Sequence, residues 1–194
     1  MKKIIAAAMV CAAVVWGIPA FADSFSEVQA RAKQGNAKAQ FDLAAKYIKG
    51  DGVSRDYAEA MKWLRKASDQ GLVQAQDMMG FMYTNGAGVQ QSYSEAAKWY
   101  RKAAEKGYAN SQFILATMYY FGNGVKQNKS EAIKWVRKAA EQGHTNAQYL
   151  VGYSYANGDG VKQNYSEAVK WFRLPARNGF APAQDALRQL GETW

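Results

Sequence analysis

Apolar residues follow a helical period along most of this chain, and the same pattern returns several times. In the segment YSEAAKWYRKAAEKG, which spans residues 93–107, they fall on one face of a helix: Tyr93, Ala96, Ala97, Tyr100 and Ala103. Lysine, arginine and glutamate occupy the opposite face. Nearly the same fifteen residues begin at positions 57, 129 and 165, so the copies are 36 residues apart. A fixed period of this length predicts a solenoid of stacked, similar units.

Each copy of this segment also carries the residues that begin and end a helix. An N-cap residue precedes it and a glutamate stands three positions later, which predicts a capping box. The N-cap residues are Asp56, Ser92, Asn128 and Asn164. A glycine in the left-handed conformation is expected to end each helix. These glycines are Gly71, Gly107, Gly143 and Gly179. In the last copy Pro175 replaces an alanine, and we expect it to kink or stop that helix.

A second amphipathic segment precedes each of these helices and is joined to it by a Gly-x-Gly-Val loop. The four versions are AQFDLAAKY, AQDMMGFMY, SQFILATMY and AQYLVGYSY. Each has a small residue in its apolar stripe, which allows a partner helix to approach closely. A unit is therefore a helix, a glycine turn and a second helix. Since one unit alone cannot bury its apolar face, neighbouring units must stack.

The 36-residue period divides the chain into four repeats and two ends. The repeats span residues 36–71, 72–107, 108–143 and 144–179. Residues 24–34 align with the second helix of a unit and residues 182–190 with a first helix, so we expect half-repeat capping helices over residues 23–35 and 180–194. A tryptophan recurs at the edge of the apolar face of each second helix, and we interpret this column as packing between repeats. Its members are Trp63, Trp99, Trp135 and Trp171.

The repeated motifs A-Q-x-x-L-G-x-M-Y, G-x-G-V and Y-x-E-A-x-K-W-x-R-K-A-A-x-x-G resemble the Sel1-like repeat family, whose members are relatives of the tetratricopeptide repeats. The resemblance covers residues 36–179. It implies an all-α fold, namely a right-handed α/α superhelical solenoid of four helix-turn-helix repeats that binds proteins. Many bacterial relatives are exported and act as adaptors, so the resemblance also implies an interaction scaffold directed to a host or to the cell envelope.

The first residues of the chain have the three parts of a cleaved signal peptide. Two lysines are followed by an uncharged apolar run over residues 4–18 and by an Ala-x-Ala site before Asp23. We expect cleavage to remove residues 1–22 and to leave a periplasmic or secreted chain without a transmembrane segment. A retained membrane anchor and lipid attachment at Cys11 are the alternatives. Because Cys11 is the only cysteine, the mature chain has no disulfide bond.

The chain is basic, with a formal net charge of +9 that becomes +7 when Lys2 and Lys3 are removed with the signal peptide. This charge favours encounters with acidic surfaces, whereas nucleic acid is not expected as a partner outside the cytoplasm. Basic residues recur on each second helix as a ladder. The ladder comprises Lys62, Arg65, Lys66, Lys98, Arg101, Lys102, Lys134, Arg137, Lys138, Lys170 and Arg173. We interpret it as a solvated convex face. Weak association of this face with an acidic partner or an anionic membrane surface is the alternative.

Residues with catalytic or metal-binding chemistry are few. His144 is the only histidine and occupies a slot that mostly bulky residues fill in the other repeats, so a structural role is expected. No metal or cofactor site is expected, because the mature chain has no cysteine and no second histidine. Some cysteine-rich Sel1-like proteins have been linked to β-lactam binding or hydrolysis, which makes a β-lactamase-like hydrolase the alternative function. The chain lacks the Ser-x-x-Lys, Ser-Asp-Asn and Lys-Thr-Gly motifs of such enzymes, and we expect it not to be an enzyme.

Candidate binding residues are those that break the repeat. On each first helix the core stripe is fixed and the opposite face varies, and in tetratricopeptide-like stacking that face lines the concave side. The second to fourth repeats place apolar and amide side chains there: Met78, Phe81, Asn85, Asn110, Ile114, Phe121, Asn146, Leu150, Tyr153 and Asn157. An apolar surface of this kind marks interaction sites, and each amide has a donor and an acceptor for an extended peptide. We therefore expect a groove for a protein or peptide. Burial of these side chains between adjacent first helices is the alternative.

Overall fold

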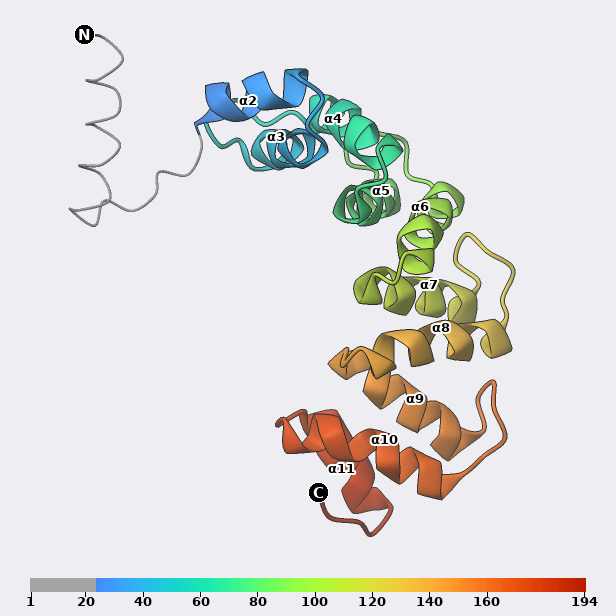
Figure 1. Ribbon diagram of the computed structural model, residues 1–194. Helices are drawn as coiled ribbons and strands as arrows, with labels where there is room; N and C mark the ends of the chain where they lie inside the picture. Colours follow the sequence, from blue (N-terminus) through green and yellow to red (C-terminus); the bar gives the residue numbers. More distant parts are fainter. Residues whose placement is uncertain (1–23) are drawn as a thin grey trace, which may run out of the picture.

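The computed structural model describes residues 24–194, which form helices and no strand (Figure 1). The helices are α2 (Phe25–Lys33), α3 (Ala37–Lys49), α4 (Tyr57–Asp69), α5 (Val73–Asn85), α6 (Tyr93–Glu105), α7 (Ala109–Phe121), α8 (Lys129–Glu141), α9 (Thr145–Asn157), α10 (Tyr165–Arg177) and α11 (Ala181–Gln189). The expected signal peptide, residues 1–22, lies outside the described residues.

The helices pair in chain order, and the pairs stack into a curved solenoid. Within the repeats α3 packs on α4, α5 on α6, α7 on α8 and α9 on α10. Figure 1 shows the pairs following an arc, with α3, α5 and α7 along its inner side and α4 and α6 along its outer side. The shorter helices α2 and α11 pack on α3 and α10 and add one layer at each end. The predicted all-α solenoid is therefore confirmed.

The second helices have the predicted N-caps but not the predicted capping boxes. Each N-cap side chain accepts a hydrogen bond from the backbone N–H of the glutamate three residues later. That glutamate binds a lysine instead of reaching back, as in the pair of Glu95 and Lys98 at 2.6 Å. The N–H of the N-cap residue donates to a tyrosine carbonyl of the preceding first helix, as from Ser92 to Tyr83 over 2.9 Å. Because this carbonyl already satisfies the N–H, the glutamate is left to pair with the lysine.

Glycines end the second helices as predicted, whereas Pro175 does not stop its helix. The four glycines have φ angles between 82° and 89°. Helix α10 continues through Pro175 to Arg177 and has 13 residues, the same length as α4, α6 and α8. The expectation that Pro175 would stop the helix was wrong. The proline lies in the last turn, where few helical hydrogen bonds follow it, and burial of its ring in the core offsets the bond that it cannot donate.

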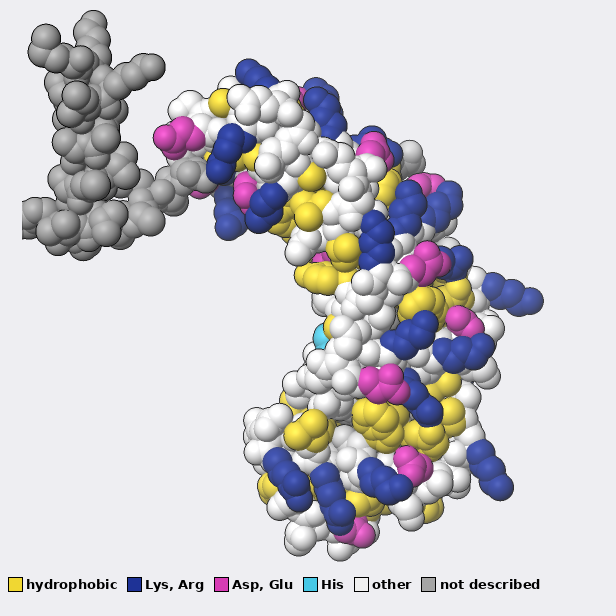
Figure 2. All heavy atoms as spheres, viewed as in Figure 1, with side chains coloured by type: hydrophobic (Ala, Val, Ile, Leu, Met, Phe, Trp, Pro, Cys, Tyr) yellow, Lys and Arg dark blue, Asp and Glu magenta, His cyan; other side chains and the backbone are white. Residues whose placement is uncertain are grey.

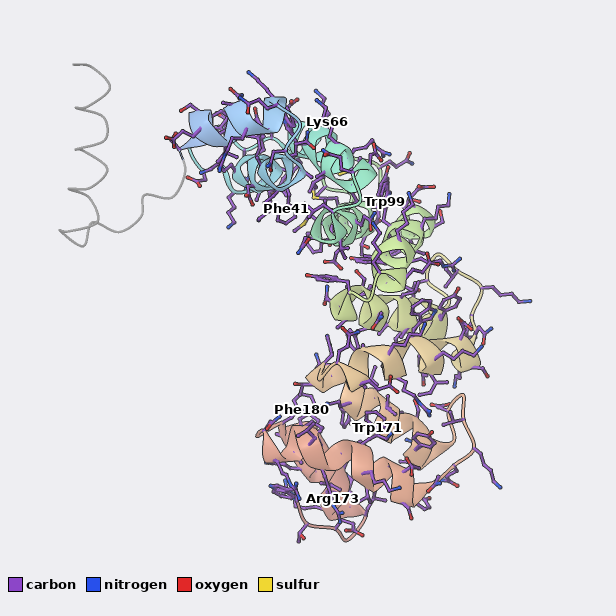
Figure 3. The ribbon with its side chains drawn as sticks, viewed as in Figure 1. Phe41, Lys66, Trp99, Trp171, Arg173 and Phe180 are labelled. Atoms are coloured by element: carbon purple, nitrogen blue, oxygen red, sulfur yellow. The ribbon has the colours of Figure 1, made fainter. Side chains whose placement is uncertain are left out.

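The hydrophobic core crosses the boundaries between repeats. Trp63, Trp99 and Trp135 are buried and Trp171 is partly buried. Trp99 on α6 joins the cluster of apolar residues from α2 to α5, and Trp171 on α10 packs against the cluster formed mainly by α7, α8 and α9. Figure 3 labels Trp99 where α6 meets the preceding repeat. These contacts confirm the interpretation of the tryptophans as packing between repeats.

Two further repeated positions join each repeat to the one before it. A glutamine on each first helix donates its Nε2 to a backbone carbonyl near the end of the preceding second helix, over 2.9 to 3.3 Å. These residues are Gln40, Gln76, Gln112, Gln148 and Gln184. The second glycine of each loop between paired helices packs against the start of an earlier second helix. At Gly124, where φ is +69°, a Cβ atom would overlap the carbonyl of Tyr93.

Candidate partner-binding face

The residues predicted to form the groove lie on α5, α7 and α9, and we call this surface the inner face. It comprises Met78, Phe81, Asn85, Asn110, Ile114, Phe121, Asn146, Leu150, Tyr153 and Asn157. Three aromatic side chains are well exposed: Phe81 by 51%, Phe121 by 65% and Tyr153 by 43%. The aliphatic side chains on the inner face are partly buried and pack with one side against the core. The three rings are therefore accessible from solvent, and the aliphatic residues are divided between core and surface.

The asparagines of the inner face use part of their hydrogen-bonding capacity within the fold. Asn85 and Asn157 donate Nδ2 to carbonyls one turn back, over 2.8 and 2.9 Å. Asn110 donates to the carboxylate of Asp77 over 3.2 Å. Each of these amides thus has one N–H fixed by the protein, while its Oδ1 remains able to accept a hydrogen bond from the backbone of a partner.

The three helices that carry the inner face contain a single charged residue, Asp77 on α5. Its carboxylate accepts a hydrogen bond from the hydroxyl of Ser111 over 2.6 Å, in addition to the bond from Asn110, and both partners lie on α7. Burial raises the pKa of Asp77, and the two hydrogen bonds lower it in part. The inner face is therefore close to electrically neutral, unlike the rest of this basic protein.

A cavity of about 330 Å³ opens between α7, α8 and α9. It is lined by residues of α7, α8 and α9 and by Asp159, and the lining residues used below are Ala116, Thr117, Phe121, Val136, Leu150 and Tyr153. Three of these residues, Phe121, Leu150 and Tyr153, also belong to the inner face. The structure therefore brings these three predicted groove residues together around one cavity.

One edge of this cavity is polar. Asp159 accepts a hydrogen bond from the hydroxyl of Tyr120 over 2.9 Å and pairs with Lys129 over 2.7 Å. The hydrogen bond from Lys129 lowers the pKa of Asp159, and the hydrogen bond to Asp159 raises the pKa of both Lys129 and Tyr120. Asp159 is negative, Lys129 positive and Tyr120 neutral at neutral pH, so the charges at this edge compensate each other.

Comparison with known proteins places these features in a family. The family model described as the Sel1 repeat matches four times, over residues 37–72, 73–108, 109–144 and 145–180. The chain belongs to the Sel1-repeat family. Each match begins one residue after the corresponding boundary expected from the sequence period. Proteins built from Sel1 repeats generally mediate protein–protein interactions.

Solved structures of Sel1-repeat proteins are similar to this chain. The protein c5321, a protective antigen of uropathogenic Escherichia coli strains with an SLR fold, is 40% identical over 86% of the chain, with a TM-score of 0.83. A Sel1 repeat protein from Oxalobacter formigenes is 37% identical over 84% of the chain, with a TM-score of 0.73. The chain spans 36% of the first of these proteins and 65% of the second. No match was found among the curated proteins.

A more distant likeness is to cysteine-rich protein B of Helicobacter pylori, which is 26% identical over 66% of the chain and 96% of its own length, with a TM-score of 0.51. The present chain has one cysteine, Cys11, which lies outside the described residues.

Among residues 24–194 no helix is long and apolar enough to cross a membrane. The same residues contain no group of three side chains from histidine, cysteine, aspartate and glutamate that could hold a metal ion.

The basic ladder of the Sel1 repeats lies on the second helices, and its side chains contact neighbouring residues. The first lysine of each set pairs with the glutamate one turn earlier. Lys66, Lys102 and Lys138 lie over tryptophan rings, with 4.1 to 4.2 Å between Nζ and the ring centroid. Figure 2 shows lysine and arginine side chains along the outer side of the arc. These contacts agree with a solvated outer face, and its weak association with an anionic surface stays a prediction.

His144 has the structural role that was expected from its place in the repeat. It is the N-cap residue of α9, and its Nδ1 accepts a hydrogen bond from the backbone N–H of Ala147 over 3.2 Å. Its ring stacks on Phe113 of α7. Burial lowers the pKa of His144. Among the equivalent residues, Asn36 also caps its helix with its side chain, whereas Leu72 does not.

The cavity is the part of the site that sequence reasoning missed. The sequence does indicate the cavity when the four repeats are compared position by position. The second helices have Leu64, Tyr100, Val136 and Phe172 at one shared position, and the smallest of these four side chains is the one that lines the cavity. A pattern of apolar residues shows that this position is buried, but it does not show that the surrounding helices leave the missing volume open.

Proposed function

We propose that this Sel1-repeat protein is an exported scaffold or adaptor, periplasmic or secreted, that binds a protein or peptide in the concave groove formed by the inner face. Membership of the Sel1-repeat family supports a protein as the partner. The N-terminal sequence and the similarity to a protective antigen support export. The target belongs to a host or to the cell envelope.

The exposure of Phe81, Phe121 and Tyr153 carries this proposal. These rings come from three consecutive first helices and from a surface with a single charged residue. A ring that stays half in solvent contributes only part of its hydrophobic free energy to folding, and the remainder is available to a partner. Aromatic side chains of this kind are the residues that most often dominate the binding energy of interfaces.

Alanine variants of the inner face test the proposal. We would substitute Phe81→Ala and Tyr153→Ala, then measure the melting temperature and the capture of the partner from an extract of the cell envelope. Loss of one central ring should cost about 2 kcal/mol or more of binding free energy. Tyr165→Ala is the matched control, because Tyr165 is a 55% exposed tyrosine on α10 outside the inner face.

Two results would contradict a groove on the inner face. One is equal capture of the partner by all three alanine variants. The other is a large drop in the melting temperature of the Phe81 and Tyr153 variants relative to the Tyr165 variant, which would show that the rings support folding.

The proposed export has its own test, since N-terminal sequencing of protein from the cell envelope should give a chain that begins at Asp23. A retained Met1 or a lipid on Cys11 would contradict cleavage at this site.

A further inference from the structure

The cavity between α7, α8 and α9 exists because the third repeat has a small residue where its neighbours have a ring. In the second and fourth repeats, Tyr100 and Phe172 pack against glycines of the paired first helix. A Cβ atom on Gly80 would lie 2.8 Å from the ring of Tyr100, and one on Gly152 would lie 2.6 Å from the ring of Phe172. A ring and a glycine therefore occur together, since neither position accepts more volume.

The third repeat has a different pair at the same two positions. Val136 replaces the ring and Ala116 replaces the glycine, and both residues line the cavity. A valine side chain has only three carbon atoms, so the volume that a ring occupies in the neighbouring repeats is left open here. The first repeat has Leu64 and Ala44 at these positions, and both are completely buried.

The size and lining of the cavity indicate what it accepts. An apolar cavity of about 150 Å³ binds one benzene molecule, so a cavity of about 330 Å³ has room for a larger ring such as an indole. Helices α7 and α9 contain no charged residue, and the Lys129–Asp159 pair at the polar edge is neutral as a whole. A charged side chain would therefore lose its hydration here without a counter-charge, whereas an aromatic side chain would not.

The rings beside the cavity point to a side chain of a larger partner. Phe121 and Tyr153 line the cavity and are still exposed by 65% and 43%. A small molecule inside the cavity would leave most of this apolar surface in water, whereas the chain on either side of a bound side chain would cover it. Both rings line the cavity, so an aromatic group inside it can make ring–ring contacts with them.

We propose that this cavity is the anchor site of the inner face, and that it takes one aromatic side chain from an uncharged, extended segment of a protein partner. The proposal rests on the proposed function, because it names the point at which the partner is held. It also states the chemistry of the segment: a tryptophan, phenylalanine or tyrosine with uncharged neighbours.

Blocked pentapeptides of sequence Ser-Gln-X-Gln-Ser are the probe. They would be titrated into the protein, with X as Trp, Phe, Leu, Lys or Asp, while NMR follows the methyl signals of Ile133, Val136 and Leu150. The Trp and Phe peptides should shift these signals saturably with a dissociation constant on the order of 1 mM, as suits one buried side chain. The Lys and Asp peptides should bind at least about tenfold more weakly, and the Leu peptide should bind less tightly than the Trp peptide.

A variant in which a side chain fills the cavity tests whether the peptide binds at this place. The double variant Ala116→Gly with Val136→Phe reproduces the Gly152–Phe172 pair of the fourth repeat, so it should fold and bind the Trp peptide at least about tenfold more weakly. The matched control is Ala44→Gly with Leu64→Phe, which places the same Gly–Phe pair in the first repeat and should bind normally. If the variant with Ala116→Gly and Val136→Phe does not fold, Thr117→Phe is used to fill the cavity instead. An aromatic residue should be accepted at residue 117, because Phe81 and Tyr153 stand at this position in the neighbouring repeats.

Four outcomes would overturn the anchor site. One is the absence of methyl shifts with the Trp and Phe peptides up to about 10 mM, ten times the expected dissociation constant. Another is unchanged peptide binding in the folded cavity-filling variant. The third is methyl shifts with free indole but not with the Trp peptide, which would make the cavity a small-molecule site. Should the cavity-filling variant still capture the natural partner while Phe81→Ala does not, the groove stands and the anchor site alone fails.

Discussion

His144 stacks on Phe113 with the ring centroids 4.6 Å apart, while its Nδ1 accepts the backbone N–H of Ala147 at the start of α9. An Nδ1 that accepts a hydrogen bond carries no proton, so this contact requires the neutral imidazole. Burial lowers the pKa of His144 below its ordinary value of 6.5. The unfolded chain therefore binds this proton more readily than the folded chain. The free energy of unfolding consequently falls as the pH drops from about 6.5 toward the lowered pKa of the folded state.

We expect this acid sensitivity to disappear in His144→Asn. Asparagine keeps a side-chain cap, as Asn36 does for α3, but it does not titrate. The melting temperature of the parent protein should fall more between pH 7 and pH 5 than that of the variant. His144→Ala should lose the cap at every pH, at a cost of about 1 kcal/mol. If the melting temperatures of the parent protein and of His144→Asn fell equally with pH, His144 would not contribute to the acid sensitivity.

The contact between Gly152 and Phe172 predicts strong coupling between the two positions. Gly152→Ala overpacks the crossing of α9 and α10, which typically costs about 1–3 kcal/mol of the free energy of unfolding. Phe172→Val also destabilises, because it removes a ring from a buried site. The double variant reproduces the Ala116–Val136 pair, and it should cost at least about 1 kcal/mol less than the sum of the single variants. Urea unfolding of all three measures this coupling, and strictly additive costs would contradict the pairing.

Two glycines with the left-handed conformation should differ in their tolerance of a side chain. Gly107 has a φ of +89° and open space around it, so Gly107→Ala should cost about 1–2 kcal/mol for the backbone conformation alone. Gly124→Ala carries the same strain, and its methyl group would also overlap the carbonyl of Tyr93 on the preceding repeat. Thermal unfolding should therefore show the larger loss for Gly124→Ala. Similar losses for both variants would mean that the loop does not hold neighbouring repeats together.

Binding on the inner face should depend only weakly on salt. Its helices contain one charged residue, Asp77, which is already hydrogen-bonded to Ser111. An increase from about 0.05 M to about 0.5 M NaCl should change the affinity for the captured partner by less than about threefold. The double variant Arg101→Glu with Lys102→Glu should bind like the parent protein. A steep salt dependence, together with loss of the partner in that variant, would place the binding site on the outer basic ladder instead.

The repeat period was sufficient to predict the solenoid, since every repeat supplies the same apolar stripes, N-cap residues and terminal glycines. The capping boxes were predicted wrongly at the second helices because the pattern shows which residues are near in sequence. It does not show that a carbonyl such as that of Tyr83 already satisfies the N–H of Ser92. Pro175 was misjudged for a related reason, because its effect depends on its place in the last turn and on burial of its ring.

Helical geometry predicts which side chains of a first helix lie opposite its core stripe, and the role of these residues in binding a partner stays a prediction. The cavity was not predicted, because it depends on how two substitutions, Val136 and Ala116, combine at one helix crossing. The hydrogen bonds of the asparagine amides were not predicted either, since the acceptors of Asn85 and Asn110 are known only from the structure. Sequence alone thus indicates a candidate face and leaves its shape undetermined.

Asp77 and Ser111 also distinguish the junction between the second and third repeats from the other junctions. The glutamine contacts recur at every boundary, so a chain that docked its repeats one unit out of order would recover most of them. Asp77 stands where the other repeats have Phe41, Phe113 and Tyr149, and Ser111 stands where they have alanine. In a misordered stack this carboxylate would face an alanine and stay partly buried without that donor, at a cost that the correct order avoids. One polar pair thereby acts as an ordering signal in a chain whose units are otherwise nearly interchangeable.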